Sequence, residues 1–375
     1  MNPIPSALIK APKKQKLQSR ESQNKEQQEK RKRDVDIARG LAIFSVVYGH
    51  IVTGLTSQII YLFHMPFFFI VSGYFHKVDR QEGRYFRKKC LSLLVPYVIY
   101  LHILQLPLLS RLISRIVENP SIEGVINFFK MLLKLLYGGE TLRGATGVFW
   151  FVTCLFLVQQ LFNFLSNRIQ SKRKLFTVAI ALYGLAYLDQ ISPVHIVPPF
   201  AANVVACAFI FYTTGAFFGD WLLNIHANRT HRMMLVAAIA ITIFCSILIS
   251  SGNRIYFDMK HGYYGYFILS PLAAIAITKL LMLGAHKLTQ YKPIGNTIAF
   301  VGTASMTIMY VHLCLEMALP EVLYQVPILK SIIIVAICCL LHTALTTNSW
   351  TKRLFLGRRL KPDSNSLRTQ GSANG

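Results

Sequence analysis

The segments RDVDIARGLAIFSVVYGHIVTGL (33–55) and IIYLFHMPFFFIVSGYF (59–75) are both apolar, and only a very short polar break separates them. They carry Arg39, His50 and His64 at positions that should lie in hydrocarbon, where ionisable side chains are costly and therefore candidates for function. Arg39 and His50 are 11 residues apart, so both lie on one face of a helix, separated by roughly 16 Å along its axis. This hairpin predicts a membrane protein with a ligand lying along the first helix.

The composition excludes a soluble globular protein. Hydrophobic residues make up 53% of the chain and charged residues 15%, with a mean hydropathy of +0.42, which leaves too little polar surface to cover a globule. The chain is therefore predicted to be an all-α, polytopic integral membrane protein with about ten transmembrane helices. The predicted spans are 36–57, 59–76, 90–109, 149–166, 174–190, 200–221, 233–251, 264–283, 294–315 and 328–348.

Basic residues concentrate in every second connection between these spans. The connections 76–89, 167–174, 220–232 and 284–293, together with the two chain ends, carry a net charge of +23, whereas the alternate connections sum to zero. Because basic segments stay on the cytoplasmic side, both termini are predicted to be cytoplasmic, which agrees with an even number of spans.

The composition divides the chain into three parts. Residues 1–33 are predicted to be a disordered basic cytoplasmic tail, residues 34–350 a membrane domain, and residues 351–375 a second basic cytoplasmic tail. The net charge of +24 is spread over alternate connections, so we attribute it to orientation and to attraction to anionic membrane lipids. Nucleic acid is not expected as a partner.

One long connection, 110–148, lies on the predicted outer side. Its stretch INFFKMLLKLLY places Lys130 and Lys134 one turn apart among apolar residues, a pattern typical of an interfacial helix. We consider two interpretations of this connection, a lid over the acceptor side and simple surface decoration.

The predicted orientation assigns a depth to the polar residues. His50, His64, Trp150, His312 and Glu316 should meet in one layer in the outer half of the membrane, and Arg39 should face the cytoplasmic entrance. Glu316 follows His312 by four residues, so it could hold that imidazole in one orientation. Each residue also has a simpler interpretation, because a lone arginine can be a snorkelling anchor, a histidine a structural hydrogen-bonding group and a tryptophan part of the aromatic belt.

The motifs in these segments resemble those of the membrane acyltransferase 3 family. The resemblance rests on Arg39-x10-His50, on FHMPFFFIVSGYF (63–75), on FWFVTCLF (149–156) and on GTASMTIMYVH (302–312), and it covers about residues 33–350. The second motif is most similar to the branch of sugar O-acetyltransferases that includes fucose 4-O-acetylase-like proteins. In another branch a glutamate follows the tryptophan, whereas this chain has Gln159 and Gln160 there.

This resemblance implies an integral-membrane O-acyltransferase, expected to transfer acetyl, with residues 34–350 as the acyltransferase domain. The acyl donor would be cytoplasmic acetyl-CoA or another acyl-CoA. The acceptor would be a hydroxyl of an extracytoplasmic sugar, such as a surface glycan or a lipid-linked sugar, and the expected location is the bacterial cytoplasmic (inner) membrane.

Site residues are assigned from the motifs and from elementary chemistry. Catalysis is assigned to His50, His312 and Glu316, because imidazole titrates near neutral pH and can act as a general base, while an oxyanion donor and a covalent acyl-histidine route stay open. Binding of the phosphate-rich CoA is assigned to Arg39, Arg84, Arg87 and Lys88. Binding of the acceptor is assigned to His64, Trp150 and Ser305.

Other classes of protein fit the sequence less well. A proton-coupled transporter or glycan exporter normally needs ionisable residues deep in the bilayer, often carboxylates, yet the acids Asp36, Asp189, Asp220 and Glu316 all fall near span ends. A structural or receptor role does not need arginine and histidine on one stripe. No metal is expected, because no close spacing of His, Asp and Glu ligands is present.

Overall fold

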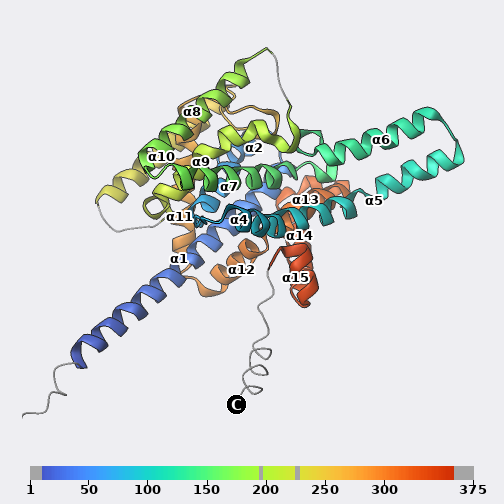
Figure 1. Cartoon of the computed structure of the whole chain (residues 1–375). Coiled ribbons are helices and arrows are strands. Elements are labelled where there is room, and N and C mark those ends of the chain that lie inside the picture. The colour runs from blue at the N-terminus through green and yellow to red at the C-terminus, as the bar shows by residue number, and fades with distance from the viewer. Residues whose placement is uncertain (1–10, 194–196, 224–228, 359–375) are drawn as a thin grey trace, which may run out of the picture.

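The computed structural model describes residues 11–193, 197–223 and 229–358, with the backbone alone for residues 11–28, 30 and 31. The described residues form helices and no strand (Figure 1). The α-helices are α1 (Ala11–Ile51), α2 (Leu55–Tyr61), α3 (His64–Tyr74), α4 (Glu82–Lys89), α5 (Val95–Glu118), α6 (Ile122–Tyr137), α7 (Trp150–Arg168), α8 (Lys172–Ile191), α9 (Ala202–Leu223), α10 (Arg229–Ser250), α11 (Leu269–Leu288), α12 (Lys292–Thr303), α13 (Ser305–Ala318), α14 (Pro327–Leu345) and α15 (Ser349–Leu356). The shorter elements are the π-helix η1 (Cys90–Leu94) and the 3-10 helices η2 (Gly139–Thr141), η3 (Gly144–Thr146), η4 (Pro199–Ala201), η5 (Met259–His261) and η6 (Glu321–Gln325).

The protein is an all-α, polytopic membrane protein, as the sequence predicts. Eight helical segments in the described part of the chain are long and apolar enough to cross a membrane, and α12 and α13 make a ninth if this pair, bent by 77°, is counted as one span. Helix α1 is not among them, because Asp34, Asp36 and Arg39 lie close together in its apolar part. On length and composition, the described residues therefore supply eight or nine spans, where about ten were predicted.

The structure differs from the predicted boundary at residue 33. Helix α1 begins at Ala11 and runs without a break to Ile51, so the predicted disorder over 1–33 does not hold for residues 11–33, which are rich in the helix-forming residues Lys, Gln, Glu and Arg. Residues 1–10 lie outside the described residues. At the other end, α15 covers the start of the predicted tail 351–375, and residues 359–375 again lie outside the described range. In Figure 1, α15 and the start of α1 both lie below the body of the molecule.

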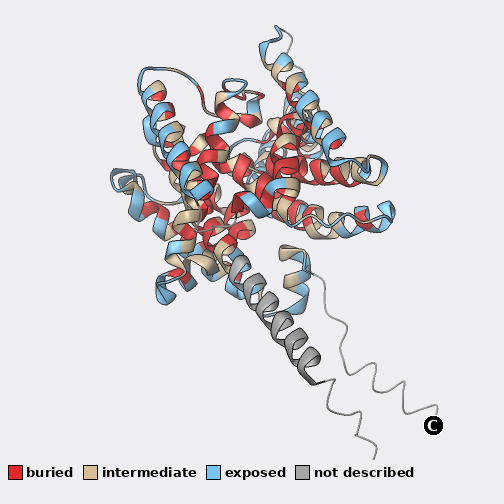
Figure 2. Ribbon diagram, turned by 90° about the vertical axis from the view of Figure 1, so that its left-hand side faces the viewer, coloured by how far each residue is buried: buried red, intermediate tan, exposed pale blue. Residues whose placement is uncertain are grey.

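Helix α1 packs against α11, α12, α13 and α14 in the body of the protein, where the buried residues gather (Figure 2). Two glycines permit its closest approach. A methyl group on Gly40 would lie 2.1 Å from the carbonyl oxygen of Ile298, and one on Gly302 would lie 1.9 Å from the carbonyl oxygen of Asp36. Small residues allow such backbone contact between helices. This contact brings Arg39, beside Gly40, to the start of α13.

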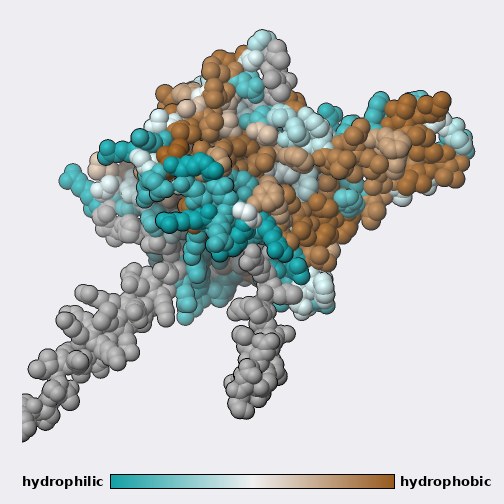
Figure 3. Space-filling model, viewed as in Figure 1, coloured by the Kyte–Doolittle hydropathy of each residue, from teal (hydrophilic) through white to brown (hydrophobic). Residues whose placement is uncertain are grey.

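Helices α5 and α6 form an antiparallel hairpin that projects from the body (Figure 1). The hairpin has a hydrophobic surface in the space-filling view, whereas a hydrophilic area lies lower on the same face of the body (Figure 3). Leu136, for example, is 72% exposed. Such a surface fits contact with lipid, and it agrees with the amphipathic character predicted for this stretch.

Candidate active site

A cavity of about 720 Å³ lies between α1, α3, α7, α13 and the turn around η5. It brings together six of the residues that the sequence singled out, from four distant parts of the chain. These residues are Arg39, His50, His64, Trp150, Ser305 and His312. The two glutamines that stand where another branch has a glutamate differ in placement. Gln159 lines the cavity, whereas Gln160 does not.

His312 is the most firmly oriented polar group in the cavity. It is fully buried on α13, and its Nδ1 lies 2.8 Å from the carbonyl oxygen of Ile308 and 3.1 Å from that of Met309. Because a carbonyl oxygen only accepts hydrogen bonds, Nδ1 must carry the proton, which leaves Nε2 of the neutral ring as a base. This Nε2 is buried without a hydrogen-bond partner among the described residues. The arrangement presents a basic nitrogen for a reacting group.

His64 and His50 complete a cluster of imidazole and phenol rings. His64 is held like His312, with Nδ1 3.0 Å from the carbonyl oxygen of Ile60. The ring centroids of His50 and His312 are 5.3 Å apart, and those of Tyr61 and His64 are 5.1 Å apart. His50 therefore lies beside the basic nitrogen-bearing ring of α13, in the same cavity.

Arg39 lines the cavity on the side where α1 enters the body. Its guanidinium donates to Oγ of Ser305 at 2.8 Å and pairs with the carboxylate of Asp36 at 3.3 Å. Ser305, which was predicted to bind the acceptor, therefore orients the guanidinium of Arg39. The single carboxylate leaves donors of the guanidinium fork available to an anionic ligand.

Glu316 does not belong to the cavity. Its carboxylate accepts a hydrogen bond from the hydroxyl of Tyr324, and His312 is oriented by backbone carbonyls instead. The backbone carbonyls of Ile308 and Met309 occupy Nδ1 of His312, and the hydroxyl of Tyr324 occupies the carboxylate of Glu316. The expected pairing of His312 with Glu316 is therefore wrong.

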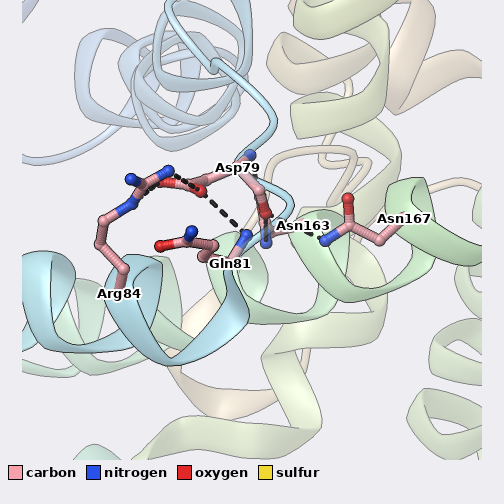
Figure 4. Close-up of polar contacts among 5 residues, drawn as sticks. All are labelled: Asp79, Gln81, Arg84, Asn163 and Asn167. Atoms are coloured by element: carbon pink, nitrogen blue, oxygen red, sulfur yellow. Dashed lines mark hydrogen bonds and ion pairs between the residues drawn. The ribbon is translucent and has the colours of Figure 1, made fainter.

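The three basic residues assigned to CoA between 76 and 89 also lie outside the cavity. Arg84 makes two hydrogen bonds to the carboxylate of Asp79, at 2.8 and 3.1 Å (Figure 4), and these bonds lower the pKa of that half-buried carboxyl group. Asn163 and Asn167 of α7 bind the backbone of Asp79 (Figure 4). Arg84 thus fastens a connection to α7. Arg87 and Lys88 are exposed on α4.

Lys89 and His76 line this side of the cavity, where Arg84, Arg87 and Lys88 had been expected. The ammonium of Lys89 lies 5.3 Å from the ring centroid of Tyr85, and it lines the cavity with His76. His76 is held by the hydroxyl of Tyr212, 2.6 Å from its Nδ1. Lys89 immediately precedes the π-helix η1, an element often found at functional sites. In the sequence, only the run of basic residues between 76 and 89 pointed to this region. Such a run does not reveal which of its side chains turns toward the cavity.

The turn around η5 supplies a further group of cavity residues, and sequence reasoning missed this group. It contributes Tyr256, Asp258, Lys260 and His261, together with the apolar Phe257 and Met259. Gly144, Gly147 and Val148 also line the cavity, whereas no residue of α6 does so. The idea of α6 as a lid is therefore not supported, and the end of the connection 110–148 is the part that reaches the site.

A family model described as an acyltransferase domain (Acyl_transf_3) matches residues 32–349. The chain belongs to the membrane acyltransferase 3 family. Searches of curated proteins and of solved structures returned no match. As a member of the membrane acyltransferase 3 family the protein is an acyltransferase, and the matched region contains every residue that lines the cavity.

Proposed function

We propose that the protein transfers an acyl group, expected to be acetyl, from acyl-CoA to a hydroxyl of an extracytoplasmic sugar or surface glycan. The observation that carries this proposal is a single cavity with cationic side chains on one side and an imidazole pair on the other. Arg39 and Lys89 suit the phosphates of CoA, while His50 and His312 lie roughly 16 Å further along the direction of α1, at about 1.5 Å per residue. That separation suits an extended pantetheine arm with its thioester at the histidines.

The chemistry proposed at the histidines is general base catalysis. Nε2 of His312, or His50 beside it, takes the proton of the acceptor hydroxyl as the hydroxyl oxygen attacks the thioester carbonyl carbon. The thiolate of CoA then leaves and accepts that proton, and the acceptor becomes an ester. His64, Tyr61 and Trp150 surround the position where the acceptor would lie.

We further propose that the side of Arg39 faces the cytoplasm, in a bacterial inner membrane. The support is the charge pattern. The basic connections and both chain ends fall on one side of the predicted spans, and the connections without net charge fall on the other. In this orientation the CoA site opens toward the cellular pool of acyl-CoA and the turn around η5 opens toward the outside.

The testing experiment uses the purified full-length chain in liposomes with radiolabelled acetyl-CoA and glycan extracts. The expected result is release of free CoA coupled to label on the extract, both lost in the His50→Ala variant. Glycan flux into the liposomes without consumption of acyl-CoA would instead identify a transporter and overturn the proposal.

A further inference from the structure

A lysine cation lies at the η5 side of the cavity, and the acyl-transfer scheme above does not use it. The Nζ of Lys260 donates a hydrogen bond to the carbonyl oxygen of Leu142 at 2.6 Å. It forms no ion pair with any carboxylate in the described ranges. Its neighbour Asp258 is occupied differently, because it contacts Nδ1 of His261 at 2.8 Å and the guanidinium of Arg254 at 3.4 Å. One N–H of the ammonium is therefore engaged by a neutral group, and its charge is not balanced by a direct partner.

The turn that carries Lys260 is firmly held. Asp258 and Tyr263 form an antiparallel bridge with backbone hydrogen bonds of 2.8 and 3.1 Å. Phe257 and Met259, on either side of Asp258, are each only 2% exposed, and the ring of Phe257 packs against Phe211 at 5.5 Å. A group that stabilises charge must be held in place before the reaction, and a braced turn provides this better than a free loop.

Lys260 also lies near Leu313, the residue that follows His312 on α13. A methyl group on Gly147 would be 3.7 Å from Nζ of Lys260 and 3.5 Å from Cδ1 of Leu313, the residue that follows His312. The ammonium and the end of the His312 turn therefore meet across Gly147. Lys260, His50 and His312 line the same cavity.

We propose that Lys260 is a catalytic residue that stabilises the oxyanion formed on the acyl group, an inference that rests on the proposed acyl transfer. When the hydroxyl oxygen bonds to the thioester carbon, the carbonyl π pair moves to oxygen and the hydroxyl proton moves to imidazole. Lys260 donates to the resulting oxyanion. When the C=O bond re-forms, the C–S bond breaks, and the thiolate leaves with the proton from imidazolium as free CoA.

Charged groups around Lys260 shape its behaviour with pH. Burial lowers the pKa of Lys260, and the charge of Arg143 adds to this effect, while the carboxylates of Glu140 and Asp258 act in the opposite direction. A lysine with a lowered pKa loses its proton at a lower pH than an exposed lysine, so its loss can be followed as a fall in kcat at alkaline pH.

The test compares Lys260→Met and Lys260→Arg with the wild type in the liposome assay, at saturating acyl-CoA and acceptor. We expect Lys260→Met to lower kcat by about 10²–10³-fold, the usual effect of losing one oxyanion donor, with little change in either KM. Lys260→Arg should recover most of kcat and lose the alkaline fall. The matched control is Lys130→Met, on the exposed surface of α6, which should leave kcat unchanged.

The outcomes separate this inference from the function on which it rests. A wild type that releases no CoA with any acyl-CoA overturns both. An active wild type with an unchanged Lys260→Met variant overturns the role of Lys260 alone. A raised acceptor KM at normal kcat would make Lys260 a recognition residue for the acceptor, and would likewise overturn its role at the oxyanion. Thermal unfolding of each variant confirms that it is folded, and Lys260→Arg keeps the test decisive if Lys260→Met is not.

Discussion

The imidazole rings of His50 and His312 lie 5.3 Å apart, centroid to centroid, with their planes inclined by 42°. They come from α1 and α13, and the backbone contact at Gly40 and Gly302 joins α1 to α12, the helix that directly precedes α13. The two rings differ in their support. His312 is oriented by two carbonyl oxygens, while no hydrogen bond joins His50 to the part of the chain that the structure describes. A fixed base and a less constrained partner thus share one cavity.

Replacement of either histidine should abolish most of the activity. We expect His312→Ala and His50→Ala each to lower kcat by about 10²–10⁴-fold, the range of general base catalysis. Because the two rings act as a unit, the double variant should lose little more than either single variant. Single-turnover CoA release measures all three.

The chain offers a matched control for His312. His102 on α5 makes the same contact with a carbonyl oxygen four residues earlier, Nδ1 to Val98 at 2.7 Å, but it is exposed and outside the cavity. His102→Ala should keep normal kcat. An equal loss in both variants would mean that the hydrogen bond to the helix, and not the free nitrogen in the cavity, explains the effect.

Arg39 should act on the binding of acyl-CoA. Arg39→Lys removes the planar fork that contacts Ser305 and, in the proposed function, would bind a phosphate of CoA. We therefore expect KM for acyl-CoA to rise about 10-fold, a loss in the range of one charge-assisted hydrogen bond. Arg84→Ala serves as control, because Arg84 is engaged by Asp79. If KM for acyl-CoA rose as much in the Arg84 variant as in the Arg39 variant, Arg84 would bind CoA after all, as the sequence predicted.

Two adjacent lysines test the side of the cavity near α4. Lys89 lines the cavity and Lys88 is exposed, although both belong to one basic run. Lys89→Ala should raise KM for acyl-CoA by about 10-fold, and Lys88→Ala should leave it within about twofold at physiological ionic strength, where exposed charges are screened. Titration of initial rates against acyl-CoA distinguishes the two, and a larger effect at Lys88 would contradict the geometry.

The contact between α1 and α12 should be intolerant of a methyl group. Gly302→Ala places a carbon against the carbonyl oxygen of Asp36, and overpacking of this kind costs about 1–3 kcal/mol. Gly184→Ala on α8 is the control, since a methyl group there meets nothing within 4 Å, and alanine is the better helix former. Thermal unfolding in detergent should show a lowered transition only for Gly302→Ala.

Stability should depend on pH through His76, two residues after the end of α3. Burial, with the nearby charge of Lys89, lowers the pKa of His76 to about 4, and the side-chain oxygen of Asn163, which favours the protonated imidazole, opposes this. The unfolded chain therefore binds this proton near pH 6.5 and the folded protein does not. The stabilisation is complete above pH 6.5 and is lost as the pH falls toward 4.

His76→Gln should reduce this pH dependence. Allowing for the partial exposure of His76, the free energy of unfolding of the variant should fall by about 1 kcal/mol less than that of the wild type between pH 7 and pH 5. Comparing the two proteins at both pH values separates His76 from the other histidines. An identical fall in both would assign the effect elsewhere.

Part of the fold and of the site could be predicted because helical spacing and depth determine both. Arg39 and His50 share a face by periodicity alone, and the motif ending at His312 brings Ser305 into the same region. Contacts that depend on tertiary packing could not be predicted in this way. The engagement of Arg84 by Asp79 and the inward turn of Lys89 are examples.

The remaining errors have local causes. The bend of 77° between α12 and α13 lies inside one apolar run, so hydropathy alone shows a straight span. Glu316 is near His312 in sequence, but each side chain has another partner, Tyr324 for Glu316 and the carbonyls of Ile308 and Met309 for His312. The turn carrying Lys260 lies in a short connection of ordinary composition, and only its bracing by buried Phe257 and Met259 gives it a fixed place in the site.

The size of the cavity has a consequence for the membrane that contains it. A space of about 720 Å³ is far larger than the space that a single water molecule needs, and water within it would offer a route along which protons could leak and dissipate the membrane potential. Arg39, Lys89 and Lys260 all line this space, and fixed positive charges repel protons and other cations electrostatically. The side chains that would attract the anionic parts of the reaction therefore also insulate the bilayer whenever the site is empty.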